Sequence, residues 1–128
     1  MPLLEANNIV KSYSKTGLEI PILNGLSMSV DKGEILVLIG PSGSGKSTLL
    51  NILGTLDTDF TGNLDIEGIP ISTSTDMAAI RRDKLGFIFQ FHHLLPEFTI
   101  HENLLIPKMI AGNHQDDSSE NIIEMLEL

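Results

Sequence analysis

The sequence contains no cysteine, few basic residues and no long apolar run. The absence of cysteine excludes disulfides, thiolate zinc sites and thiol nucleophiles together. The 8 Lys and Arg residues are outnumbered by 17 Asp and Glu residues, and the net charge of −9 argues against nucleic acid or an anionic lipid surface as a partner. The longest clean apolar run, residues 35–39, is far shorter than the ~18–20 residues that span a bilayer. We therefore expect no nucleic-acid partner and no direct membrane insertion. Because no signal peptide is recognised, the expected compartment is the cytoplasm.

The length and the amino-acid composition of the chain are typical of one folded domain. The chain has 128 residues, of which 41% are hydrophobic and 20% are charged. These proportions are ordinary for a globular protein and argue against disorder. A chain of this size buries about two thirds of its surface on folding, which is enough to form a core.

Apolar spacing and turn residues predict a mixture of strands and helices. Strands are expected over residues 3–13, 18–23, 26–30, 35–39, 62–66, 69–71 and 85–89, and helices over 46–56, 76–84 and from 99 onward. Turn sequences such as Asn24-Gly25 and Glu67-Gly68 separate neighbouring strands. The segments 35–39 and 85–89 are expected to be central strands that are buried on both faces.

Two capping patterns mark helix starts in the last third of the sequence. Thr99 and Glu102 have the spacing of a capping box, in a helix that Pro107 is expected to disturb and Gly112-Asn113 to close. Residues 117–120 repeat the capping pattern ahead of an apolar stripe. That last helix runs to the end of the sequence without a C-cap, which favours a truncated chain.

The strongest chemical signal is a full match to the phosphate-loop pattern G-x-x-x-x-G-K-[ST], which follows the run 35–39 and opens the helix expected over 46–56. Its residues, with the threonine that follows, are Gly40, Pro41, Ser42, Gly43, Ser44, Gly45, Lys46, Ser47 and Thr48. Glycines let backbone amides approach phosphate oxygens, and the helix N-terminus adds positive potential. Lys46 supplies a charge for the β- and γ-phosphates, the Ser47 hydroxyl a ligand for Mg²⁺, and Thr48 a contact to the α-phosphate. A glycine-rich turn with an incidental lysine is the weaker interpretation, because strand, loop and helix occur together.

Features outside the loop indicate the class of nucleotide-binding protein. No N-K-x-D segment is present, so a GTPase that reads guanine is not indicated. Tyr13, the only tyrosine, ends the first expected strand, and Gln90 follows the expected strand 85–89, 44 residues after Lys46. This arrangement resembles the nucleotide-binding subunit of ABC transporters. The resemblance implies that Tyr13 stacks on adenine, that Gln90 contacts Mg²⁺ and the attacking water and begins the segment touching the membrane subunit, and that Lys46 and Gln90 serve catalysis.

A finer resemblance concerns the segment 86–99, which reads Gly-Phe-Ile-Phe-Gln-Phe-His-His-Leu-Leu-Pro-Glu-Phe-Thr. This run resembles the lipoprotein-releasing (LolD-type) branch of the family, and residues 53–57 fit the same branch and its macrolide-export relatives. Two departures lie outside the nucleotide site: His101 replaces an expected apolar residue, and residues 60–62 lack a common proline. Adjacent histidines do not easily ligate one metal, so His92-His93 is interpreted as a partner contact or as packing.

The resemblance also implies a fold and an assembly. The expected fold class is α/β, a P-loop NTPase with a RecA-like ABC ATPase core and an N-terminal antiparallel β subdomain. Residues 1–128 would form only the N-terminal half of one nucleotide-binding domain, from the phosphate loop to the glutamine loop, so the fold is expected to be truncated. The intact subunit would bind ATP and Mg²⁺, pair head to tail with a second ATPase subunit, and power integral membrane permease subunits. It would lie on the cytoplasmic face of the inner membrane and drive the release of lipoproteins.

The sequence lacks the other catalytic elements of that family. It has no Leu-Ser-Gly-Gly-Gln signature loop, no apolar strand ending in Asp-Glu and no switch histidine after them. These elements supply the Mg²⁺ carboxylate, the catalytic base and the contact across the dimer, so the 128 residues alone are expected not to hydrolyse ATP. Two alternatives are a stand-alone, non-hydrolysing nucleotide-binding or regulatory module and a macrolide-export-type ATPase. A small P-loop kinase is disfavoured, because such an enzyme has no use for a glutamine-loop segment.

Overall fold

The computed structural model describes residues 1–112, 121 and 124–125. The chain divides into two compact units, Met1–Met77 and Ala78–Leu128. Asn113, the capping pattern at 117–120 and the apolar stripe after it lie outside the described residues, except for isolated positions. Among the helices that are described, none is long and apolar enough to cross a membrane.

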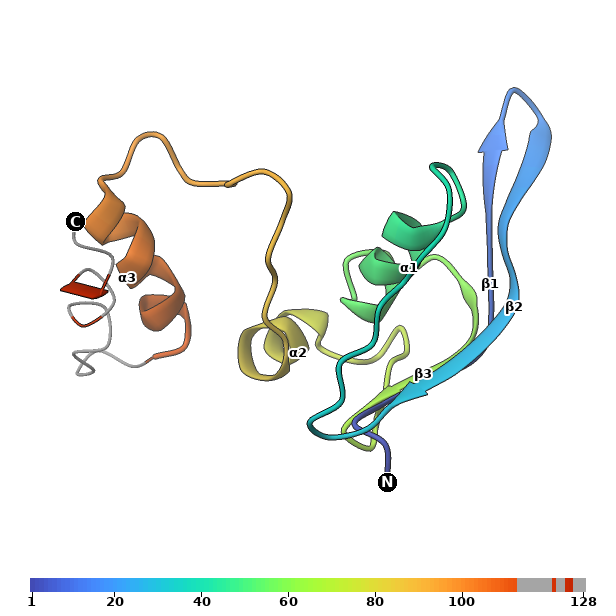
Figure 1. Cartoon of the computed structure of the whole chain (residues 1–128), viewed down its shortest axis with the longest axis horizontal. Coiled ribbons are helices and arrows are strands. Elements are labelled where there is room, and N and C mark those ends of the chain that lie inside the picture. The colour runs from blue at the N-terminus through green and yellow to red at the C-terminus, as the bar shows by residue number, and fades with distance from the viewer. Residues whose placement is uncertain (113–120, 122–123, 126–128) are drawn as a thin grey trace. The chain divides into compact units, whose positions relative to one another are not determined.

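The first unit is built on a four-stranded antiparallel sheet in the order β2-β1-β3-β4. Its strands are β1 (Leu4–Lys15), β2 (Leu18–Val30), β3 (Thr61–Ile66) and β4 (Ile69–Pro70) (Figure 1). The turns Thr16-Gly17 and Glu67-Gly68 have positive φ at both residues, which suits two-residue hairpins. The expected N-terminal antiparallel β subdomain and the hairpin around Glu67-Gly68 are therefore confirmed.

Asn24-Gly25 is not the turn that the sequence predicts, because β2 continues through it. Ile9 pairs with Leu26 and Val10 with Asn24, so Gly25 is an extra residue in β2 and forms a bulge. Its φ of 79° explains the glycine. Gly25 thus bends one long strand and does not separate two.

The helix α1 (Lys46–Leu53) follows the phosphate loop and shares the core of the first unit. Its buried residues Leu49, Ile52 and Leu53 lie on one helix face, at spacings of three and four. The buried strand residues of this core are Ala6, Ile9, Leu23, Leu64 and Ile66. The helix ends before the expected Leu56, because the chain turns back at Thr55, whose φ is 57°.

The segments 35–39 and 85–89 are not strands in the described structure, which corrects the expectation of two central strands. Ile35, Val37 and Ile39 are 90%, 71% and 91% exposed, and Phe87, Ile88 and Phe89 are exposed as well. A strand needs a neighbour for its N–H and C=O groups, and no described residue pairs with these segments. Their apolar side chains are therefore left in contact with solvent.

Two helices follow, α2 (Met77–Lys84) and α3 (Ile100–Ile110). The capping box of α3 is confirmed: the Thr99 side chain accepts from the Glu102 amide, and the Glu102 carboxylate accepts from the Thr99 amide. The Thr99 amide and the Thr99 hydroxyl both donate to the Glu102 carboxylate, which holds the pKa of Glu102 below its ordinary value. Pro107 lies inside α3 without ending it, and Gly112, with a φ of 75°, follows the C-cap as expected.

Candidate functional site

The phosphate-loop residues form a tight loop that rests on β2. Gly43 and Gly45 have φ values of 80° and 90°, a region that other residues rarely adopt. A Cβ at Gly45 would lie 3.0 Å from Ile22 Cγ2 and 3.1 Å from Leu23 Cδ2, so the loop backbone passes directly against the strand. The glycine pattern of the motif is thus needed for the backbone path and for its close packing.

Lys46 folds its side chain back over the loop that precedes it. Its Nζ donates to the carbonyl oxygens of Gly40 and Pro41, each at 2.7 Å, and lies 3.3 Å from Ser44 Oγ. Each of these partners belongs to the loop and none carries a charge. Among the described residues, no carboxylate forms an ion pair with this ammonium group.

The N-terminus of α1 is open toward the same place. No side chain caps it, its N-cap is Gly45, and no acidic residue lies in its first turn. The first amides of a helix have no partner within the helix and carry its positive dipole end. A hollow of about 520 Å³ adjoins them, and it is lined by Ile22, Ser42, Gly43, Gly45, Lys46, Ser47 and Thr48. Free amides, an ammonium group and three hydroxyl side chains around one hollow suit a polyphosphate.

Tyr13 lies on β1, the strand that pairs with β2 near this loop. It pairs with Ile20 of β2, two residues before Ile22, which lines the hollow. Its side chain is 45% exposed, so part of the ring is accessible to a ligand. The structure thus places Tyr13 and the phosphate loop in the same unit, beside neighbouring residues of β2.

Lys11 is a buried cation that the sequence analysis missed. Only 4% of its side chain is exposed, and its Nζ lies 3.0 Å from Asp57 Oδ2 and 3.1 Å from Asp59 Oδ2. Burial lowers the pKa of a lysine, but the hydrogen bonds to Asp57 and Asp59 outweigh it and raise the pKa of Lys11. The available signal was its position two residues after the apolar Ile9, on the inward face of an alternating strand.

Gln90 belongs to the second unit, where it is exposed at a bend after residues 85–89. The neighbouring aromatic side chains are ordered: Phe87 stacks on Phe89 at 5.5 Å, and Phe89 meets His93 edge to face at 4.8 Å. The role of Gln90 beside Mg²⁺ stays a prediction. In the described part of the chain no group of three His, Asp or Glu residues could hold a metal ion.

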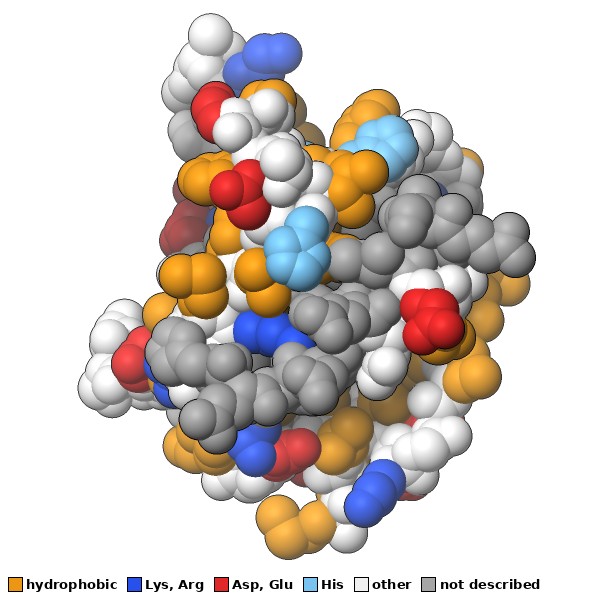
Figure 2. Space-filling model, turned by 90° about the vertical axis from the view of Figure 1, so that its left-hand side faces the viewer, with side chains coloured by type: hydrophobic (Ala, Val, Ile, Leu, Met, Phe, Trp, Pro, Cys, Tyr) orange, Lys and Arg blue, Asp and Glu red, His pale blue; other side chains and the backbone are white. Residues whose placement is uncertain are grey.

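The second unit also exposes an apolar segment ahead of α3. Leu94, Leu95 and Phe98 are exposed, and hydrophobic and histidine side chains lie next to one another on the face shown in Figure 2. The Asn103 side chain holds this segment in shape, because it accepts from the Leu95 amide and donates to the carbonyls of Leu95, Phe98 and Thr99. The backbone of this exposed segment is therefore fixed by hydrogen bonds to Asn103.

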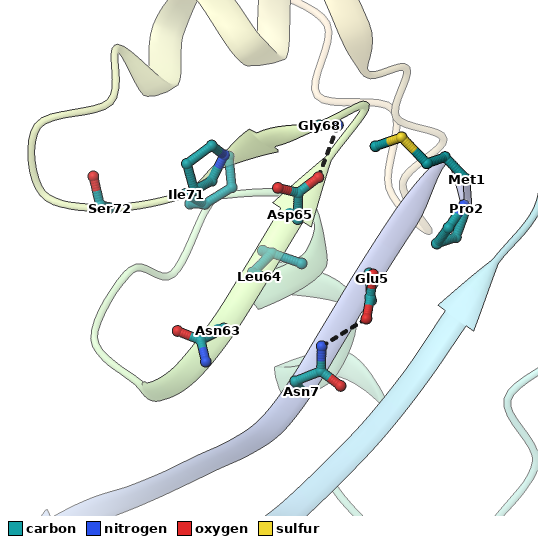
Figure 3. A pocket seen from close by; sticks show the side chains of 11 residues that line it. Met1, Pro2, Glu5, Asn7, Asn63, Leu64, Asp65, Gly68, Ile71 and Ser72 are labelled. Atoms are coloured by element: carbon teal, nitrogen blue, oxygen red, sulfur yellow. Dashed lines mark hydrogen bonds between the residues drawn. The ribbon is translucent and has the colours of Figure 1, made fainter.

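Another hollow, of about 500 Å³, lies at the other end of the sheet (Figure 3) and contains none of the predicted site residues. Its lining includes Glu5, Asn7, Asp65 and Gly68. Asn7 donates to Glu5, and Asp65 accepts from the Gly68 amide, so these polar groups already have partners. The phosphate-loop hollow is the better candidate.

Comparison with known proteins gives consistent results at three levels. A family model described as "ABC transporter" matches residues 23–128. The lipoprotein-releasing system ATP-binding protein LolD of Alcanivorax borkumensis is 44% identical over 98% of this chain and 56% of its own length. The LolD protein of Ehrlichia canis is 47% identical over 94% of this chain and 54% of its own length.

A solved structure shares the fold. The dimeric, post-hydrolysis state of the ATP-binding cassette MJ0796, bound to ADP and Pi, matches with a TM-score of 0.86 and 33% identity. The match covers 98% of this chain and 57% of that one. The chain thus spans a little over half the length of the relatives that it matches.

Proposed function

This chain belongs to the ABC transporter family, and we propose that it is the ATP-binding part of a transporter ATPase subunit. The observation that carries the proposal is the pairing of Lys46 with the uncapped N-terminus of α1 at one hollow. The hollow is lined by hydroxyl, amide and ammonium groups and by no acidic side chain. Residues 1–128 are then the N-terminal half of one nucleotide-binding domain.

The loop residues divide the work of holding a nucleotide. Lys46 exchanges the carbonyls of Gly40 and Pro41 for β- and γ-phosphate oxygens, which gives stronger, charge-assisted hydrogen bonds. The amides of the loop and of the first turn of α1 bind the other phosphate oxygens. Thr48 contacts the α-phosphate, and the exposed ring of Tyr13 stacks on adenine.

Ser47 supplies the hydroxyl ligand for Mg²⁺ in this proposal. Ser47 lines the hollow next to Lys46, so its hydroxyl would hold Mg²⁺ beside the bound phosphates. When bound, Mg²⁺ neutralises charge on the phosphates. Gln90 contributes a second Mg²⁺ contact and orients the attacking water, so that Lys46 and Gln90 serve catalysis in the intact subunit.

Binding measurements on Lys46→Ala in the full-length subunit test this site. We expect the affinity for Mg-ATP to fall by about 2–3 kcal/mol, or roughly 30–150-fold, because the charged donor to the phosphates is lost. GTP should bind only modestly more weakly than ATP, because stacking on Tyr13 tolerates either base. Displacement of a fluorescent nucleotide measures both.

Lys32→Ala is the matched control, since Lys32 is an exposed lysine of the same unit outside the loop, and it should leave binding unchanged. A strict preference for guanine, or equal effects of the two alanine variants, would contradict the assignment.

We further propose that the intact subunit pairs head to tail with a second ATPase subunit and powers permease subunits that release lipoproteins. It lies on the cytoplasmic face of the inner membrane. The names of the LolD relatives support lipoprotein release rather than macrolide export, and the dimeric cassette supports the pairing. The exposed segment at Leu94, Leu95 and Phe98 supplies an apolar surface for the permease, with the adjacent His92-His93 as further contacts.

Leu95→Asp in the full-length subunit tests the permease surface. We expect lipoprotein release to fall while Mg-ATP affinity is unchanged, because the charge enters an apolar contact outside the phosphate loop. Release assays in membranes that contain the permease measure the effect. Leu18→Asp, at an exposed leucine of the first unit, is the control and should have no effect. Normal release by Leu95→Asp would reject this surface.

A separate proposal concerns the 128 residues by themselves, and the comparisons do not favour a stand-alone regulatory module. Its 128 residues contain the phosphate loop, Ser47 and Gln90, but no signature loop and no Asp-Glu strand. We propose that they bind Mg-ATP without turning it over, and that hydrolysis belongs to the intact subunit.

A further inference from the structure

Lys11 lies next to the residue that we propose stacks on adenine. It occupies β1 opposite Leu23, two positions before Tyr13. Alternate residues of a strand share one face, so the two side chains project from the same side of β1. The Lys11 Nζ lies 5.1 Å from the centroid of the Tyr13 ring, within the range of a cation–π contact.

The same ammonium group is bound to the segment that follows α1. It donates to Asp57 Oδ1 at 3.0 Å, to Asp59 Oδ2 at 3.1 Å and to the Asp59 backbone carbonyl. Asp57 is itself bound to the helix, because its amide donates to the Asn51 carbonyl at 3.1 Å. A buried charge that is fully paired in this way is held in one place.

Lys11 therefore connects the Tyr13 ring to the far end of the helix that the phosphate loop opens. The loop contacts β2 at Gly45, beside Ile22 and Leu23, and Leu23 is the cross-strand partner of Lys11. The Tyr13 ring is thus connected to the phosphate loop and its helix by two routes. One route runs through β2, and the other through Lys11 and Asp57.

We propose that Lys11 is a positioning residue, which holds the Tyr13 ring in register with the phosphate loop so that one nucleotide engages both. The inference rests on the proposed binding of ATP with Tyr13 on the base. A ring ordered before binding loses less entropy when the nucleotide arrives. Lys11 itself need not touch the nucleotide.

The test compares a ligand that has a base with one that lacks it. The variant Lys11→Met, made in the full-length subunit, keeps roughly the length of the side chain and removes its charge. We expect Mg-ATP to bind roughly 3–10-fold more weakly and Mg-tripolyphosphate to bind unchanged, as calorimetry would measure. Lys11→Arg should restore ATP affinity, and Lys15→Met, an exposed lysine of the same strand, should have no effect.

Destabilisation of the fold would give a different pattern. Equal weakening of ATP and tripolyphosphate, or no change in either, would overturn the proposal. If Lys11→Met does not fold because Asp57 is left unpaired, the double variant Lys11→Met with Asp57→Asn removes both charges, and the same selective loss is expected.

Tyr13→Ala, measured in parallel, separates this inference from the proposed function. If Tyr13→Ala weakens ATP selectively and Lys11→Met does not, only the positioning role of Lys11 is rejected. If Tyr13→Ala leaves ATP affinity unchanged, both the stacking of adenine and the positioning role are rejected.

Discussion

Two glycines of the phosphate loop have the same backbone conformation and different surroundings. Gly43 and Gly45 both have φ between 80° and 90°, where an alanine costs about 1–2 kcal/mol. A Cβ at Gly43 meets nothing within 4 Å, whereas one at Gly45 also approaches the Ile22 backbone carbonyl at 3.3 Å. Only the second position adds a packing penalty to the backbone strain.

We therefore expect Gly45→Ala to lower the free energy of unfolding by about 1–3 kcal/mol more than Gly43→Ala does. Ile22 itself has no cross-strand partner, but its neighbours Pro21 and Leu23 pair with Ser12 and Lys11 of β1, which limits how far β2 can move away. Denaturant unfolding of the two full-length variants measures the difference, with Gly43→Ala as the matched control. Equal midpoints would mean that the loop does not press on β2 as described.

Single residues differ in how well the sequence predicts them. The place of Lys46 at the phosphate loop was predictable, because the residues that it contacts, from Gly40 to Ser44, are also its neighbours in the sequence. Lys11 was missed because its partners, Asp57 and Asp59, are 46 and 48 residues away. A local motif indicates a candidate site, whereas the sequence does not show which distant residues pair with a buried lysine.

At the scale of elements, the sequence predicts well the turns and helix caps that depend on residues close in the sequence. The hairpin at Glu67-Gly68 and the capping box of α3 formed as expected, and the helix after the phosphate loop formed but ended three residues early. Pro107 did not interrupt α3, whose C-cap is Ala111. A proline in the last turn removes one hydrogen bond, and the remaining turn tolerates that loss.

The two segments 35–39 and 85–89 show the limit of this reasoning. Their apolar composition predicts a strand with both faces covered, but the strand itself exists only when a neighbour pairs with it. No described residue does so, and the side chains are exposed. This chain spans only 56–57% of the length of the relatives. The apolar composition of 35–39 and 85–89 indicates burial on both faces, which the described residues do not provide.

At the scale of the whole molecule, the predicted nucleotide site is divided between two units. The phosphate loop, Tyr13 and Lys11 lie in Met1–Met77, whereas Gln90 lies in Ala78–Leu128. The first unit has a sheet, a helix and a buried core, so the part that we propose binds phosphate is well formed. The predicted contribution of Gln90 depends on how the units meet, which sequence spacing does not determine.

The 128-residue chain expressed alone should neither hydrolyse ATP nor remain monodisperse. Hydrolysis requires a positioned water and a carboxylate base, and no acidic residue lines the hollow at the phosphate loop. Exposed, unpaired backbone with apolar side chains at 35–39 and 85–89 favours association between copies.

Phosphate release should therefore equal that of the Lys46→Ala chain, and size-exclusion chromatography should show oligomers or aggregate. A soluble monomer that unfolds cooperatively would show that 35–39 and 85–89 are covered within the chain. Turnover above the Lys46→Ala control would show that the 128 residues already hold a catalytic base. The acidic residues of the first unit, beginning with Asp57 because of its contact with Lys11, would then be the ones to replace.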